Sequence, residues 1–143
     1  MLVYLDMCCF NRPFDDQSQP RIQLETEAKL LIQQKVRSSV IGLVWSFMLS
    51  YENSANPDTD VSGSISNWEH LASVTVTPHQ EIIEQAKRFE LPGIDSKDAL
   101  HISCAVAARA QYFITVDKGI LKHRNRVTGV HIRSPLEFVE QED

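Results

Sequence analysis

Short apolar runs alternate with longer helical patterns along this chain, and this alternation restricts the fold more than any other feature. Apolar positions recur at helical spacing in residues 21–36, where Leu24, Ala28 and Leu31 lie one turn apart. From residue 97 to 110 the chain is small and apolar nearly all round, which predicts a helix packed inside the protein. The expected strands are residues 2–5, 39–43, 74–76, 112–115 and 130–132. Alternation of this kind predicts a three-layer α/β/α fold with a mostly parallel central sheet.

The remaining segments are less regular. Residues 44–53 favour a helix, although Val44 and Trp45 would also suit a strand. Residues 53–66 are rich in Asn, Ser, Asp, Pro and Gly and predict a surface loop. A helix is expected to follow Pro78, and Ser134-Pro135-Leu136-Glu137 forms a capping box that predicts a short closing helix.

Length and composition indicate an ordinary globular protein. A chain of 143 residues suits a single domain over residues 1–143, and 43% hydrophobic and 23% charged residues argue against disorder. No apolar stretch approaches the roughly 18 residues of a membrane span. The N-terminus lacks the basic region of a secretory signal, so we expect a cytoplasmic protein that does not associate with a membrane.

The cysteines do not predict a disulfide or a zinc site. Cys8 and Cys9 are neighbours in sequence and Cys104 is remote, so the set is odd and poorly placed for bridging. No Cys-x-x-Cys spacing occurs and the histidines are scattered singly, which disfavours zinc. We expect small buried thiols.

Four acidic residues stand where separate segments end or begin. They are Asp6, Glu52, Asp98 and Asp117. Carboxylates at the ends of parallel strands converge at one edge of the sheet, where such folds bind ligands, and hard divalent cations prefer oxygen ligands. Each residue also has an ordinary structural account, as a turn or helix cap or as a surface charge, but one metal site explains all four together.

The charge distribution is uneven. A net charge of −5 counts against a nucleic acid partner, because Lys and Arg drive phosphate binding. However, Arg12 follows Asp6 closely, and a basic stretch begins directly after Asp117 with Lys118. Such a stretch is also typical of a solvated surface, and both interpretations stay open.

In order and spacing, these residues resemble the PIN domain, a family of metal-dependent nucleases that includes the VapC-type toxins. The resemblance rests on four sites that are distributed in order along nearly the whole chain. They are Tyr4-Leu5-Asp6, Glu52, Lys97-Asp98-Ala99-Leu100-His101-Ile102 and Phe113-Ile114-Thr115-Val116-Asp117-Lys118. One departure is Met7, which stands where many members have a small hydroxyl residue. The resemblance implies a PIN-like fold.

The resemblance also implies a function. The acidic quartet Asp6, Glu52, Asp98 and Asp117 would bind Mg²⁺ or Mn²⁺ and hydrolyse RNA phosphodiester bonds, which makes the protein a metal-dependent endoribonuclease. Thr115, Arg12 and Lys118 are the expected substrate-binding residues. Family members are often homodimers, and the toxins among them are held inactive by an antitoxin. The competing hypothesis is a non-catalytic PIN-like module that binds RNA or a protein partner, which Met7 and the net acidity favour.

Overall fold

A computed structural model describes residues 1–142 and contains a five-stranded sheet in which every strand pairing is parallel. The strand order is β3-β2-β1-β4-β5. The strands are β1 (Leu2–Leu5), β2 (Gly42–Ser46), β3 (Val74–Val76), β4 (Tyr112–Ile114) and β5 (His131–Arg133). The parallel sheet predicted from the sequence is therefore confirmed.

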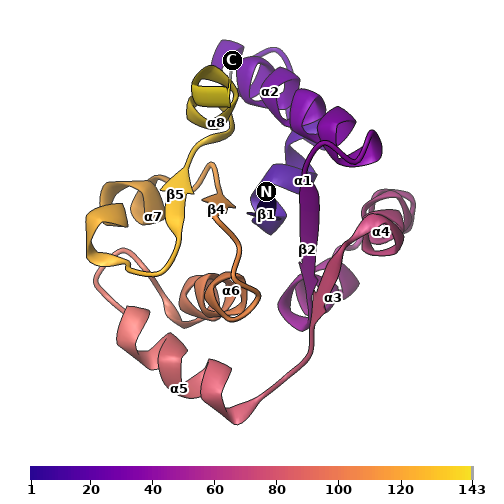
Figure 1. Cartoon of the computed structure of the whole chain (residues 1–143). Coiled ribbons are helices and arrows are strands. Elements are labelled where there is room, and N and C mark those ends of the chain that lie inside the picture. Colours follow the sequence, from indigo (N-terminus) through magenta and orange to yellow (C-terminus); the bar gives the residue numbers. More distant parts are fainter. Residues whose placement is uncertain (143) are drawn as a thin grey trace.

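Helices cover both faces of the sheet (Figure 1). Helices α2 and α8 pack together on one face, and α5 and α6 pack together on the other. The α-helices are α1 (Met7–Asn11), α2 (Pro20–Arg37), α3 (Phe47–Ser54), α4 (Thr59–Ser66), α5 (Gln80–Phe89), α6 (Ser96–Ala107), α7 (Lys118–Lys122) and α8 (Pro135–Glu142). The described residues 1–142 also contain three short 3₁₀ helices: η1 (Arg12–Phe14), η2 (Asn67–Leu71) and η3 (Arg124–Arg126). The predicted three-layer α/β/α fold is confirmed.

The core lies between the sheet and its helices. Val3, Tyr4 and Leu5 of β1 are completely buried, as expected for a central strand that is covered on both faces. Four small side chains of α6 are also completely buried, those of Ala99, Ser103, Cys104 and Ala105, so this helix packs closely against the sheet. Within residues 1–142, no helix combines the length and the apolar character that crossing a lipid bilayer requires.

The strand order creates a point at which the winding of the sheet reverses. The chain starts at β1 in the centre, moves outward to β2 and β3, and then returns to place β4 on the other side of β1. Leu5 pairs with Ile114, so β1 and β4 end side by side. Ligands of open α/β sheets bind beyond the carboxyl ends of the strands at such a point.

The predicted boundary between the second strand and the following helix was wrong. The strand occupies Gly42–Ser46 and the helix starts at Phe47, whereas residues 44–46 had been assigned to the helix. Val44 and Trp45 are buried beside β1 and β3, and burial on both faces removes the alternation that marks a strand. The Ser46 hydroxyl accepts a hydrogen bond from the Leu49 N–H at 3.2 Å and so fixes the helix start.

The predicted surface loop over residues 53–66 contains helix α4. Asp58 caps this helix by accepting hydrogen bonds from the N–H groups of Asp60 and Val61, and Ile65 is buried against the core. Local polarity suggested a loop, but capping and one buried face are enough for a helix when tertiary packing supports it. The capping box at the last helix is confirmed, with Ser134 and Glu137 bonding each other's N–H groups.

The buried face of α2 differs from the predicted one. Leu24 and Leu31 are about half exposed, whereas Glu25 and Lys29 are buried. The Lys29 ammonium lies 5.2 Å from the centre of the Phe10 ring, and burial is the main cause that lowers its pKa to about 8. The buried face therefore lies one residue further along the helix than the leucines suggested.

Candidate metal centre

Asp6 follows β1 directly and lies at the reversal point of the sheet. Its Oδ1 atom accepts a hydrogen bond from the Met7 N–H at 2.8 Å, so it caps α1. Its Oδ2 atom accepts a hydrogen bond from the Thr115 hydroxyl at 2.8 Å. Asp6 is only 6% exposed, so these contacts hold its carboxylate in one orientation at the edge of the sheet.

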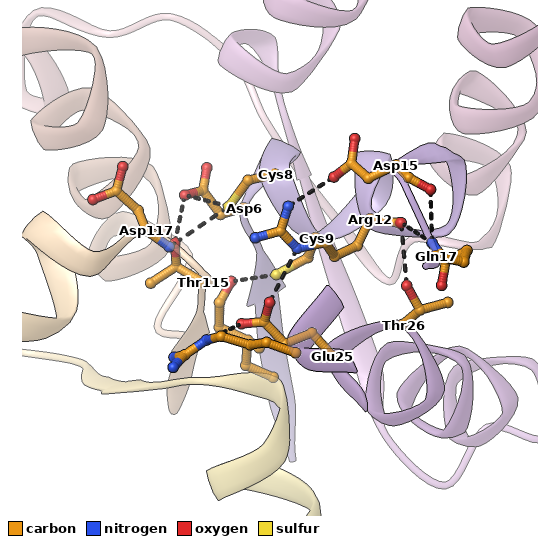
Figure 2. A network of polar contacts seen from close by, with 12 residues as sticks. Asp6, Cys8, Cys9, Arg12, Asp15, Gln17, Glu25, Thr26, Thr115 and Asp117 are labelled. Carbon is orange, nitrogen blue, oxygen red and sulfur yellow. Dashed lines mark hydrogen bonds and ion pairs between the residues drawn. The ribbon is translucent and has the colours of Figure 1, made fainter. Parts of the chain in front are cut away.

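Thr115 connects the ends of the two central strands (Figure 2). While its hydroxyl donates to Asp6, the same oxygen accepts a hydrogen bond from the Asp117 N–H at 3.0 Å. The Thr115 side chain is completely buried. Thr115 therefore orients the carboxylate of Asp6 and fixes the backbone of Asp117, and its side chain presents no exposed surface to a substrate.

Asp117 is held at the start of α7. Its Oδ1 atom accepts a hydrogen bond from the Ile120 N–H at 3.0 Å. Gly119 permits this turn, because a β-carbon there would lie 2.5 Å from the Gly93 carbonyl oxygen and 3.1 Å from the Asp117 carboxylate. Close contact between the Gly93 turn and α7 therefore helps to place Asp117.

Asp98 approaches from the first turn of α6. This helix leads into β4 and packs on the sheet, so its N-terminus lies at the carboxyl edge of the strands. As predicted, Asp95 caps the helix by accepting a hydrogen bond from the Asp98 N–H at 2.9 Å. Partial burial, followed by the negative charges of Asp6, Asp95 and Asp117, raises the Asp98 pKa to about 7. Asp6, Asp98 and Asp117 therefore lie within electrostatic reach of one another.

The raised Asp98 pKa predicts that the metal-free protein loses stability as the pH rises. The carboxyl titrates near 3.8 when unfolded and near 7 when folded, so the folded state binds more protons between these values and deprotonation favours unfolding. Because Asp98 is only partly buried and solvent screens its charge, we expect a loss of only about 1–2 kcal/mol. Urea unfolding between pH 4 and pH 8 in EDTA measures it, and Asp98→Asn should remove this part of the pH dependence. An unchanged pH profile in the variant would contradict the assignment.

Glu52 lies near the end of α3 and is bonded to a histidine. Its Oε1 atom accepts a hydrogen bond from His101 Nε2. Burial alone would lower the His101 pKa, but the bond to Glu52 and the charges of Asp6, Glu52 and Asp98 raise it. His101 therefore interacts with Glu52 through a hydrogen bond and with Asp6 and Asp98 through their charges.

The four acidic residues carry the oxygen ligands that a hard divalent cation prefers, although their side chains do not converge on one point. Within residues 1–142 no three His, Cys, Asp or Glu side chains are close enough to hold a metal ion as they lie, and the Asp98 carboxylate accepts no hydrogen bond from this part of the chain. Cys8 lies 3.4 Å from Asp6 Oδ2, but its pKa is raised, first by its contact with Cys9, so it stays a neutral thiol. The candidate metal ligands are therefore mainly carboxylate oxygens, which Mg²⁺ and Mn²⁺ prefer.

The two basic residues expected to bind substrate have different environments. Arg12 is engaged on both sides, since its Nη1 lies 2.8 Å from Asp15 and its Nε lies 3.2 Å from Glu25 (Figure 2). Lys118 is exposed directly after Asp117. It lines a hollow of about 530 Å³ together with Lys122, Arg21 and Arg124, but Glu137 and Glu140 line the same hollow and Arg124 is ion-paired with Glu137 at 2.9 Å. Lys118 is therefore the freer of the two for contact with a phosphate.

A second hollow adjoins Glu52. It has a volume of about 470 Å³, and its lining includes Met7, Phe14, Glu52 and Asn53. Met7, the departure from the family pattern, is buried at the rim of the candidate site. This hollow offers space for a ligand beside one of the four acidic residues.

Comparisons with known proteins agree with this architecture. In the crystal structure of VapBC2 from Rickettsia felis bound to a DNA fragment from its promoter, one chain superposes with a TM-score of 0.57. The match covers 94% of this chain and 98% of that one, at 14% sequence identity. No protein-family model and no curated protein matches the sequence. The comparison shows a shared fold.

The hydrogen-bond partners of the acidic residues were not predicted from the sequence motifs. Tyr4 and Ser46 form a buried hydrogen-bonded chain with His101, and Glu25 forms a buried ion pair with Arg12. One signal was available, because His101 follows Asp98 by three residues and so shares its helix face. The other partners are distant in sequence and left no local pattern.

Proposed function

We propose that the protein is a Mg²⁺- or Mn²⁺-dependent endoribonuclease that hydrolyses RNA phosphodiester bonds at Asp6, Glu52, Asp98 and Asp117. The observation that carries the proposal is the grouping of Asp6, Asp98 and Asp117 at the reversal point of the sheet, with the Asp98 pKa raised to about 7. Burial and the neighbouring negative charges both disfavour the ionised form of Asp98, and a bound cation would offset both.

In this proposal the acidic residues bind metal, and a bound divalent ion would lower the pKa of an attacking water and stabilise the leaving oxygen. Asp6 and Asp117 would supply ligands, since Thr115 orients the carboxylate of Asp6 and fixes the backbone of Asp117. Asp98 would turn its carboxylate, which has no hydrogen-bond partner within residues 1–142, toward the same ion. Glu52 would complete the acidic set beside the 470 Å³ hollow.

The exposed cations of the hollow next to Lys118 would guide the RNA. Lys118 and Lys122 are exposed on α7, and Arg21 lies across the same hollow on α2. These cations would neutralise backbone phosphates and offset the overall net charge of −5. The choice of RNA over DNA follows from the resemblance to PIN domains, because no residue described above selects a 2′-hydroxyl.

Partner proteins are proposed on the same resemblance. The superposed chain belongs to the VapBC2 assembly, and this supports regulation of the present protein by an antitoxin. A homodimer is proposed on the family pattern alone.

The second candidate function is a non-catalytic PIN-like module that binds RNA or a protein. The observation that favours it is the separation of the carboxylates, since no three metal-binding side chains within residues 1–142 are grouped tightly. The buried Met7 beside Asp6 also departs from the nuclease pattern. A module of this kind would bind RNA without responding to metal.

Metal-linked stabilisation separates the two functions. We expect free Mn²⁺ at about 100 times its dissociation constant to raise the free energy of unfolding by about 2.7 kcal/mol. The double variant Asp6→Asn, Asp98→Asn should lose this increase. Asp60→Asn is the matched control, because Asp60 is an exposed aspartate on α4, and it should respond like the unmodified protein. No stabilisation of the unmodified protein by Mn²⁺ would favour the binding module.

A further inference from the structure

A chain of buried hydrogen bonds leads from the core to Glu52. The Tyr4 hydroxyl lies 2.7 Å from the Ser46 hydroxyl and 2.6 Å from His101 Nδ1. His101 Nε2 then bonds the Glu52 carboxylate. Tyr4 and Ser46 are completely buried and His101 is 1% exposed, whereas the Glu52 side chain is 29% exposed. The three buried groups therefore form a rigid support for one partly exposed carboxylate.

Each member of this chain is held by a different element. Tyr4 belongs to β1, Ser46 ends β2 and His101 lies on α6. The Tyr4 ring stacks on Phe113 of β4, with ring centres 5.2 Å apart. Since three strands and one helix fix the tyrosine and the imidazole, the His101 ring has little freedom to rotate.

The direction of the last hydrogen bond does not depend on the charge of His101. When the imidazole is neutral, Nδ1 accepts the hydrogen of the Tyr4 hydroxyl and Nε2 carries the remaining proton. When it is charged, both nitrogens donate. In either form His101 donates its Nε2–H to the Glu52 carboxylate, which is the arrangement that orients an ion-binding carboxylate.

We propose that His101, held by Tyr4, is a positioning residue that fixes the Glu52 carboxylate for metal binding. The proposal rests on the proposed metal-dependent function. Without this bond, Glu52 would sample several rotamers near the end of α3, where Ser54 is the last helical residue. Hydrogen-bonded supports of metal ligands typically change metal affinity about 10- to 100-fold when they are removed.

The experiment measures the Mn²⁺ dissociation constant by titration calorimetry for single and double variants. His101→Ala is expected to weaken Mn²⁺ binding about 10- to 100-fold. His101→Gln keeps an N–H donor near the Nε2 position and should restore most of the affinity. In the Glu52→Gln background, His101→Ala should have no further effect, because His101 acts only through Glu52.

Ser103→Ala is the matched control. Ser103 is completely buried on the same helix, but its hydroxyl bonds the Ile82 carbonyl at 2.7 Å. This variant should lose stability and keep the affinity for Mn²⁺. Equal losses of affinity in Ser103→Ala and His101→Ala would overturn the inference, as would additive effects of His101→Ala and Glu52→Gln.

The outcomes also separate this inference from the proposed function. Failure of Glu52→Gln to weaken Mn²⁺ binding would contradict the role of Glu52 as a ligand. If Glu52→Gln weakens binding while His101→Ala does not, only the positioning role of His101 fails. Urea unfolding of every variant shows whether each affinity is measured on folded protein.

Discussion

Arg12→Met is expected to lower the free energy of unfolding by about 3 kcal/mol, because it leaves a buried carboxylate without its main partner. The Glu25 side chain is 2% exposed and lies 3.2 Å from Arg12 Nε, whereas its second basic partner, Arg21, is 3.7 Å away. Urea unfolding measures the loss. Methionine preserves most of the side-chain volume, so the effect reports the lost charge and hydrogen bonds.

Two matched variants test this explanation. Arg21→Met should cost less than about 1 kcal/mol, since the Arg21 side chain is 64% exposed and its ion pair is screened by solvent. The double variant Arg12→Met, Glu25→Met should recover most of the stability, because a buried ion pair can be replaced by apolar groups of similar size. Equal costs for Arg12→Met and Arg21→Met would contradict the structural role of Arg12.

Asp6→Asn is expected to reduce metal-dependent RNA cleavage by about 10²- to 10³-fold or more. Asparagine removes one negative charge from the group formed with Asp98 and Asp117, while its amide oxygen can still cap α1 through the Met7 N–H. The fold should therefore persist while metal affinity falls. Initial cleavage rates in Mn²⁺, together with circular dichroism, measure the two effects.

The control for this variant is Asp16→Asn. Asp16 is exposed in the loop after η1, where its carboxylate accepts hydrogen bonds from the Ser18 hydroxyl at 2.7 Å and the Ser18 N–H at 3.0 Å. Its cleavage rate should match that of the unmodified protein. Cleavage by Asp6→Asn at an unchanged rate would remove Asp6 from the proposed site.

The sheet and the places of Asp6 and Asp117 just beyond strands β1 and β4 could be predicted because both depend on local signals. Buried parallel strands are short apolar runs, and an acidic residue that ends such a run must lie at the carboxyl edge. The capping box at Ser134 and the Asp95 cap were also local features. For these elements, neighbouring residues carry the information that determines the structure.

The buried polar contacts could not be predicted in this way. Tyr4 and His101 meet although they are 97 positions apart, and Glu52 and His101 are 49 apart. On α2, Glu25 and Lys29 face inward because Arg12 and the Phe10 ring stabilise them there. Their burial depends on tertiary partners that periodicity does not reveal.

The measurement that tests the central claim most directly is cleavage of a mixed, labelled RNA pool by the purified protein in Mn²⁺, with EDTA and Asp98→Asn as controls. We predict cleavage in Mn²⁺, none in EDTA, and a loss of about 100-fold or more in the variant. Cleavage that persists in EDTA, or that Asp98→Asn retains, would contradict a metal-dependent nuclease at this site. An intact RNA pool after incubation with Mn²⁺-saturated protein would contradict the nuclease proposal and favour the binding module.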